Sequence, residues 1–129
     1  MCHVLIIEDE PRIALMIQDA LEEVGATSFS FALTENEAVQ MAEVQRPAVI
    51  SADVQLLEGT GPAAVERIYA ALGRIPAMFV TGNPDMCEPS YGCEILEKPV
   101  TLHQIQAAFE RIAPAEVLQA IFKAASGPA

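Results

Sequence analysis

Three acidic residues stand together near the start of the chain, where the segment LIIEDEP places Glu8, Asp9 and Glu10 directly after an apolar run. Adjacent carboxylates repel one another unless water screens them or a positive charge lies among them. Clustered carboxylate oxygens are the ligands that a hard divalent cation such as Mg²⁺ prefers. Acidic residues at the start of a helix are also stabilised by its dipole, so the segment alone leaves both interpretations open.

Later positions carry groups that complement these acids. Asp53 follows the apolar segment AVISA, Thr81 follows PAMFV, and Lys98 with Pro99 follows CEILE. Taken singly, an aspartate or a threonine after a strand often forms a turn or a helix cap, and a Lys-Pro pair has no special meaning. Together they offer a carboxylate, a hydroxyl and an ammonium group. An ionised aspartate becomes a competent nucleophile once positive charge offsets its own.

The elements that must position these groups are apolar runs of strand length alternating with longer segments of helical periodicity. Nearly continuous apolar strands indicate a sheet covered on both faces. We therefore predict a doubly wound α/β domain with five parallel strands. The predicted strands span residues 3–8, 27–32, 48–52, 76–80 and 93–97, and the predicted helices span 12–25, 34–45, 61–73 and 102–112. Thr34 and Glu37 have the spacing of a capping box at one helix start.

Ligands of such folds bind where the carboxyl ends of the strands open. The acids at 8–10 stand at the end of the first predicted strand, and Asp53, Thr81 and Lys98 each follow a later one. We therefore expect their side chains to meet at that one edge of the sheet.

Two regions depart from the alternation. Residues 81–92 contain two prolines and two glycines, which predicts a degenerate fourth helix. We predict that residues 1–113 form the domain and that residues 114–129 add a short helix and a frayed tail. The apolar stripe of this extension should pack on the chain's own core, and it consists of Val117, Leu118, Ile121 and Phe122.

The length, net charge, hydropathy and cysteine content of the chain argue against several classes of protein. A chain of 129 residues has room for one domain. The formal charge of -11 opposes direct binding to nucleic acid. No apolar run is long enough to cross a bilayer and no secretory leader is evident, which predicts a cytoplasmic protein without membrane contact. The three cysteines form no C-x-x-C pair, so we expect reduced thiols and no zinc site.

In this order and at these separations, the residues resemble the receiver domain of two-component response regulators, the CheY-like family, over about residues 3–112. The resemblance implies a flavodoxin-like sheet of strand order 2-1-3-4-5. Gly61, eight residues after Asp53, falls on the loop glycine of that family. The segments ADVQL and PAMFVTGNP are similar to the receivers of bacterial general stress response regulators.

The resemblance implies a role for each site residue. Asp53 would accept a phosphoryl group from a sensor histidine kinase or a phosphotransfer protein, while Thr81 and Lys98 would bind that group. The peptide before Pro99 would be cis. Mg²⁺ (or Mn²⁺) would be held by Glu8, Asp9, Asp53 and the backbone carbonyl of Gln55.

The sequence departs from the family pattern in the switch region. Ile95 occupies the position of the aromatic residue that usually changes orientation on phosphorylation in this family. A different part of the protein must therefore report the phosphorylated state. Leu57 replaces a common loop proline. Gln55 and Asn83 flank the expected approach of hydrolytic water, and we expect them to tune the lifetime of the phosphoryl group.

The sequence favours a stand-alone response regulator, a monomer or weak homodimer, that passes its phosphoryl group on or acts on an unknown downstream protein when phosphorylated. The expected partner surface consists of residues 82–97 and the helix that follows them. An alternative is a pseudo-receiver that binds a partner without phosphorylation, which Ile95 and the disrupted helix favour slightly. A phosphohydrolase that uses Asp53 as nucleophile is disfavoured, because Gln55 stands where an acid would protonate the leaving group. Apart from self-phosphorylation and autodephosphorylation, we expect no enzyme activity.

Overall fold

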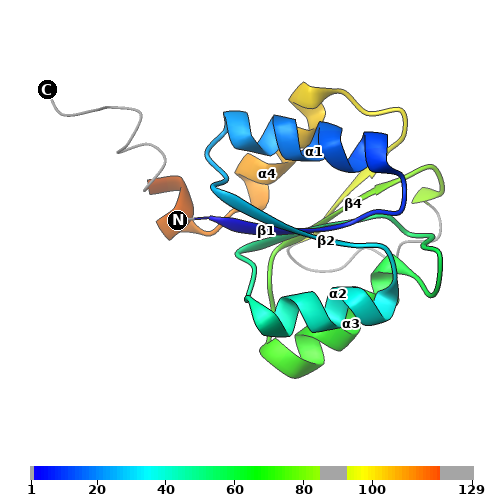
Figure 1. Cartoon of the computed structure of the whole chain (residues 1–129). Coiled ribbons are helices and arrows are strands. Elements are labelled where there is room, and N and C mark those ends of the chain that lie inside the picture. Colours follow the sequence, from blue (N-terminus) through cyan, green and yellow to red (C-terminus); the bar gives the residue numbers. More distant parts are fainter. Residues whose placement is uncertain (1, 85–92, 120–129) are drawn as a thin grey trace, which may run out of the picture.

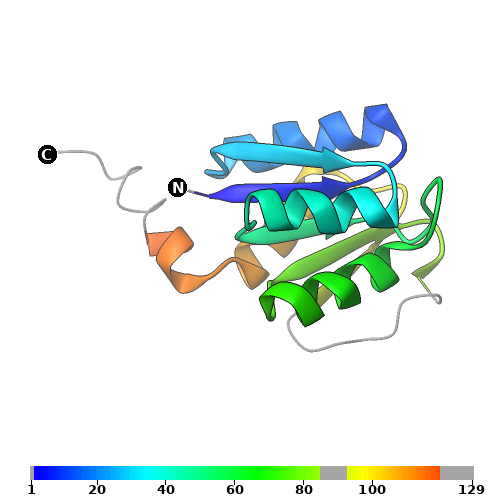
Figure 2. The same cartoon turned by 60° about the horizontal axis from the view of Figure 1, so that its bottom comes forward.

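A single parallel sheet forms the centre of the computed structural model, which describes residues 2–84 and 93–119. Its five strands follow the order β2-β1-β3-β4-β5, as Figures 1 and 2 show. The strands are β1 (His3–Ile7), β2 (Ser28–Ala32), β3 (Val49–Ala52), β4 (Ala77–Thr81) and β5 (Cys93–Glu97). The predicted flavodoxin-like, doubly wound fold is confirmed.

Helices cover both faces of this sheet. Helices α1 (Pro11–Glu23) and α4 (Leu102–Ile112) lie together on one face, and α2 (Glu35–Val44) and α3 (Gly61–Leu72) lie together on the other (Figure 1). The helix starts are set by local chemistry, because Thr34, Thr60 and Thr101 each accept a hydrogen bond from the backbone N–H three residues on. Helix α1 begins instead with a proline at its first turn.

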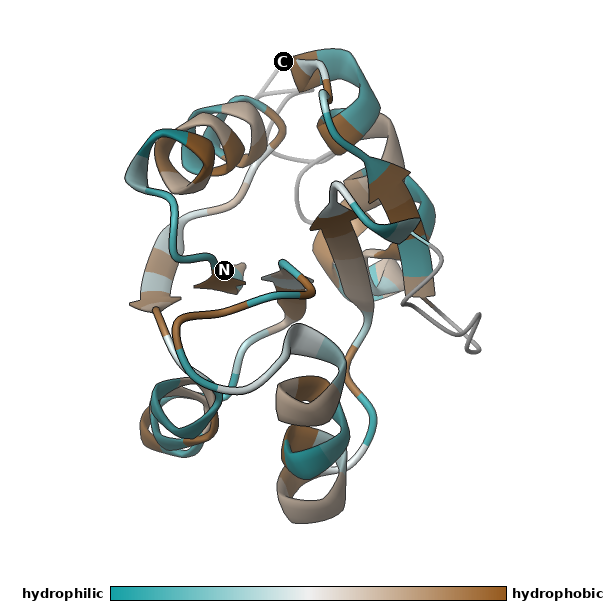
Figure 3. Cartoon of the chain, turned by 90° about the vertical axis from the view of Figure 1, so that its right-hand side faces the viewer, coloured by the Kyte–Doolittle hydropathy of each residue, from teal (hydrophilic) through white to brown (hydrophobic). Residues whose placement is uncertain are grey.

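The core consists of two apolar layers, one on each side of the sheet. Successive residues of a strand point to opposite faces, so Val4 and Ile6 join the layer under α1 and α4. Leu5 and Ile7 join the layer under α2 and α3. Figure 3 views the molecule from the side on which the strands end and shows hydrophobic residues along the strands. Burial on both faces explains why the strands read as continuous apolar runs.

The predicted boundaries agree with the structure to within two residues. The predicted capping box at α2 is only half present. Thr34 accepts from the backbone N–H of Glu37, but the Glu37 carboxylate accepts from the N–H of Leu33 instead of returning to Thr34. A complete capping box occurs at α4, between Thr101 and Gln104.

After α4, the backbone is helical at residues 115–119, which lie beside the amino end of β1 (Figure 1). Val117 and Leu118 pack against the layer under α1 and α4. The other half of the stripe, Ile121 and Phe122, and the degenerate fourth helix expected within 81–92 lie largely outside the described residues. None of the helices in the described parts of the chain is long and apolar enough to span a membrane.

Candidate functional site

Four carboxylates gather at the edge where the strands end. One oxygen from each of Glu8, Asp9, Glu10 and Asp53 lies within 4.8 Å of the others. The first three follow β1 and Asp53 follows β3, and these neighbouring parallel strands pair up to Ile7 and Ala52. The common edge therefore brings together groups more than forty residues apart, as the sequence predicted.

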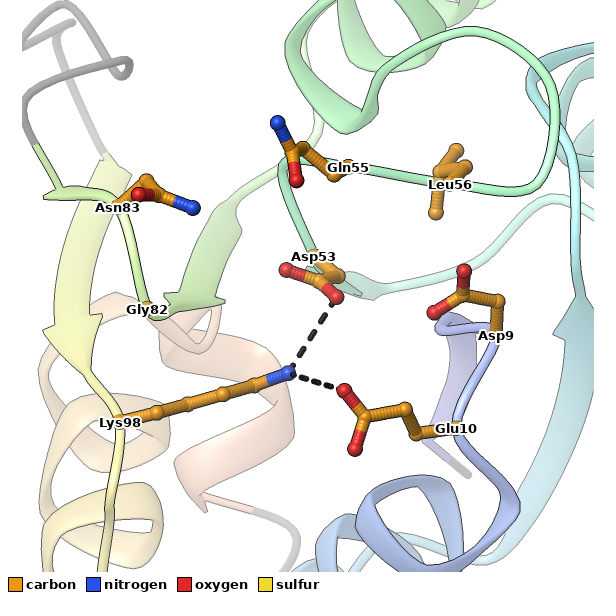
Figure 4. Close-up of a pocket in the computed structure, with 8 residues that line it drawn as sticks. All are labelled: Asp9, Glu10, Asp53, Gln55, Leu56, Gly82, Asn83 and Lys98. Carbon is orange, nitrogen blue, oxygen red and sulfur yellow. Dashed lines mark hydrogen bonds and ion pairs between the residues drawn. The ribbon is translucent and has the colours of Figure 1, made fainter.

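Lys98 reaches this cluster from the end of β5. Its Nζ lies 3.3 Å from Asp53 Oδ2, 3.3 Å from Glu8 Oε1 and 3.6 Å from Glu10 Oε1. Figure 4 shows its extended side chain pointing between Asp53 and Glu10. Burial alone lowers the pKa of Lys98, but the surrounding carboxylates outweigh it and the pKa is raised. Lys98 is therefore held as a cation, and its peptide bond to Pro99 is cis, as expected.

Glu8 is the buried member of the cluster, with 3% of its surface exposed. Burial and then the negative charge of Asp53 raise the pKa of Glu8 to about 8. Its Oε2 accepts a hydrogen bond of 3.3 Å from the backbone N–H of Glu10. Its Oε1 makes no hydrogen bond to any residue that the structure describes, although the Lys98 ammonium lies nearby.

This donor set fits a hard divalent cation. Four carboxylates face one ammonium group, and one buried carboxylate oxygen lacks a hydrogen-bond donor among the described residues. Oxygen ligands of this kind suit Mg²⁺, whose charge would offset the repulsion between them. Glu10 is not among the cation ligands that the resemblance implies, but it belongs to the same cluster. The position of Glu10 directly after Glu8 and Asp9 in the sequence is the feature that could have indicated this.

Asp53 lies at the floor of a cavity of about 360 Å³. Its Oδ1 accepts a hydrogen bond of 2.7 Å from the backbone N–H of Val54, which leaves Oδ2 facing Lys98. Figure 4 shows the lining, which consists of Asp9, Glu10, Asp53, Gln55, Leu56, Gly82, Asn83 and Lys98. A nucleophilic carboxylate, a fixed cation and open space therefore occur in one place.

Four predicted site residues stand outside this lining, namely Glu8, Thr81, Ile95 and Pro99, and the burial of Thr81 and Ile95 bears on the switch. Thr81 is 1% exposed, and its hydroxyl accepts a 2.9 Å hydrogen bond from the backbone N–H of Asn83. Ile95 pairs in register with Phe79 and packs against the apolar layer under α2 and α3. The neighbours Gly82 and Asn83 line the cavity instead of Thr81. Direct binding by Thr81 would therefore require a local movement.

Gly61 has a clear steric role in the loop after the acceptor. A Cβ at this position would lie 1.7 Å from the backbone carbonyl oxygen of Asp53. The Gly61 N–H also donates a 2.8 Å hydrogen bond to the carbonyl of Val54. Only glycine permits this close approach, which explains the residue that the resemblance singled out.

The comparisons agree with this geometry. Residues 4–110 match the family model of the response regulator receiver domain, so the chain belongs to that family. Receiver domains are signalling modules of two-component systems that bind Mg²⁺ at an acidic pocket.

The similar proteins include several called PhyR. Over 85 residues, the chain is 39% identical to the phyllosphere-induced regulator PhyR of Methylorubrum extorquens, covering 64% of this chain and 32% of that protein. The receiver domain of Erythrobacter litoralis PhyR superposes with a TM-score of 0.76 at 28% identity, covering 86% of this chain and 88% of that one.

The crystal structure of the anti-anti-sigma factor PhyR from Bartonella quintana gives a TM-score of 0.74 at 32% identity, covering 96% of this chain and 51% of that one. The chain thus spans only a third to a half of the two longer relatives. The predicted similarity to stress-response receivers is confirmed.

Proposed function

We propose that this receiver accepts a phosphoryl group on Asp53 from a sensor histidine kinase or a phosphotransfer protein. It then signals through phosphorylation-dependent protein interaction or passes the phosphoryl group on. The observation that carries the proposal is the placement of Asp53 Oδ2 3.3 Å from the Lys98 ammonium, on the floor of an open cavity.

The reaction would be an in-line displacement. An oxygen of Asp53 would form the bond to phosphorus while the bond from phosphorus to the imidazole nitrogen of the donor breaks, and the imidazole leaves. Lys98 would neutralise charge on the phosphoryl oxygens. Glu8, Asp9, Asp53 and the backbone carbonyl of Gln55 would hold Mg²⁺, which supplies further neutralising charge when bound. No external base is needed, because the nucleophile is already a carboxylate.

The neighbouring residues would set the lifetime and the readout of the phosphoryl group. Gln55 and Asn83 line the cavity beside Asp53, where they can restrict the approach of water. Thr81 would exchange its hydrogen bond with Asn83 for one to a phosphoryl oxygen. Ile95 is packed in the apolar layer, so we propose that the loop after Thr81, and not an aromatic side chain, reports the state of the site.

The partners follow from the family and from the charge. The donor would be a histidine kinase or a phosphotransfer protein in the cytoplasm. The description of the Bartonella relative as an anti-anti-sigma factor makes a regulator of sigma factors one candidate for the downstream protein. A formal charge of -11 disfavours nucleic acid as a direct partner. We propose that the protein works as a monomer or weak homodimer.

Intact mass spectrometry after incubation with Mg²⁺ and a small acyl phosphate tests the proposal. We expect the wild-type chain to gain one phosphoryl group, and we expect no gain in Asp53→Asn or with a chelator present. The Asp53→Asn variant keeps nearly the same shape and is the matched control. A gain that persists in Asp53→Asn would contradict Asp53 as the acceptor.

The second candidate function is a pseudo-receiver that binds its partner without phosphorylation. The specific observations in its favour are the buried Thr81 hydroxyl, engaged by Asn83, and the aliphatic Ile95. In that case the same experiment would give no phosphoryl gain, and a folded protein would show no Mg²⁺-dependent rise in its unfolding midpoint.

A further inference from the structure

The turn between β3 and α3 forms one wall of the cavity. Its two arms are joined by an isolated antiparallel bridge between Gln55 and Thr60 and by a long hydrogen bond of 3.4 Å from the N–H of Leu56 to the carbonyl of Gly59. Gln55 and Leu56 line the cavity. The position of this turn therefore decides where the backbone of Gln55 lies relative to the carboxylates.

Glu35, the first residue of α2, contacts this turn from outside at three consecutive residues. Its backbone N–H donates a 3.0 Å hydrogen bond to the carbonyl of Glu58, and its Oε1 accepts one of 3.5 Å from the N–H of Thr60. Between them, the backbone of Gly59 (φ +82°) lies so close that a Cβ there would be 2.6 Å from the Cβ of Glu35. Glu35 thus packs against the tip of the turn as well as bonding to it.

Arg67 fixes the other oxygen of the same carboxylate. Its Nη1 lies 2.9 Å from Glu35 Oε2 and donates a further 2.7 Å hydrogen bond to Asn36 Oδ1. Arg67 belongs to α3, the helix into which the turn leads. The Glu35 carboxylate therefore joins three segments: the start of α2, the tip of the turn and the body of α3.

We propose that Glu35 is a positioning residue for the cation site, because it holds the 54–61 turn in the place that presents the Gln55 carbonyl to the acidic cluster. The inference rests on the proposed function, in which that carbonyl is a Mg²⁺ ligand. The side chains of Glu35 and Arg67 are 24% and 46% exposed, so an ion pair of this kind contributes little to global stability. Its effect should appear in the site and not in the unfolding midpoint.

Calorimetric titration of the full chain with Mg²⁺ tests this role. We expect Glu35→Ala to bind Mg²⁺ roughly tenfold more weakly, as is typical when an outer support of a ligand is removed. Amide exchange at residues 56–60 should become faster in this variant. Glu35→Gln, which keeps an acceptor for Thr60, should recover most of the affinity. Glu43→Ala removes the same charge from an exposed position on the same helix and is the control.

The proposal would be overturned by unchanged Mg²⁺ affinity in Glu35→Ala, by an equal loss in Glu43→Ala, or by a loss in Glu35→Gln as large as that in Glu35→Ala. A fall in unfolding midpoint that accounts for the loss of affinity would also overturn it. Phosphorylation of the wild-type chain separates a failure of the proposed function from a failure of the positioning role of Glu35. If the wild-type chain binds Mg²⁺ but takes up no phosphoryl group, the proposed function fails while the Glu35 comparison still stands. If it is phosphorylated and Glu35→Ala binds Mg²⁺ normally, only the positioning role fails.

Discussion

The two ends of strand β1 both carry a buried ionisable side chain, in very different surroundings. At the amino end, both ring nitrogens of His3 lie within hydrogen-bond distance of hydroxyls on β2, 2.7 Å from Ser28 Oγ and 2.8 Å from Ser30 Oγ. At the carboxyl end, one oxygen of Glu8 has no hydrogen-bond partner among the described residues, and three further carboxylates lie beside it. Burial lowers the pKa of His3, whereas burial and then the negative charge of Asp53 raise the pKa of Glu8 to about 8.

The difference separates a structural polar group from a functional one. His3 is buried with its hydrogen bonds formed, so its neutral form is stable without any ligand. Glu8 and its neighbours are buried or crowded, and the one Lys98 ammonium offsets only part of their negative charge, which costs folding free energy unless a cation binds. We expect perturbations at the carboxyl edge to change both stability and ligand binding, and those at the amino edge to change stability alone.

The largest expected effect is steric and lies at the carboxyl edge. Gly61→Ala should lower the free energy of unfolding by about 3 kcal/mol, because the new Cβ would lie 1.7 Å from the Asp53 carbonyl oxygen. Urea unfolding measures the loss, and Mg²⁺ binding should weaken with it. Gly82→Ala is the control, since a Cβ at Gly82 would have no atom of the described residues within 4 Å. Equal stability of the two variants would mean that Asp53 tolerates displacement.

The next effect is electrostatic. The folded chain holds the Glu8 proton more tightly than the unfolded chain, with a pKa of about 8 against 4.5. Glu8 therefore contributes its full stability below pH 4.5, and this contribution is lost as the pH rises toward 8. In the metal-free protein above pH 8, Glu8→Gln should raise the free energy of unfolding by about 2 kcal/mol and should abolish Mg²⁺ binding.

Urea unfolding of the wild type and of Glu8→Gln, with a chelator present and at pH values from about 5 to about 8.5, measures this effect. The two stability curves should converge at the acid end and separate at the alkaline end. Parallel curves would show that Glu8 is ionised throughout and that Lys98 already compensates its charge.

The sequence predicted the gathering of Glu8, Asp53 and Lys98 because each follows an apolar run, and parallel strands end at one edge. It did not predict the contact of Glu35 with the 54–61 turn, because a glutamate at a helix start has a sufficient local explanation. Nor did it predict that the Thr81 hydroxyl bonds to Asn83 instead of opening to the cavity. Strand ends follow from patterns of local sequence, whereas side-chain direction and contacts between loops depend on tertiary packing.

The smallest effect is expected at the amino edge, where Ser30→Ala removes the buried partner of His3 Nε2. The unpaired nitrogen should cost about 1 kcal/mol in urea unfolding, with Mg²⁺ binding unchanged. Ser28→Ala should cost less, because Ser28 is only half-buried and water can replace its hydroxyl. If Ser30→Ala weakened Mg²⁺ binding as much as it weakened the fold, the two ends of β1 would be coupled, and the division between a structural end and a functional end would be wrong.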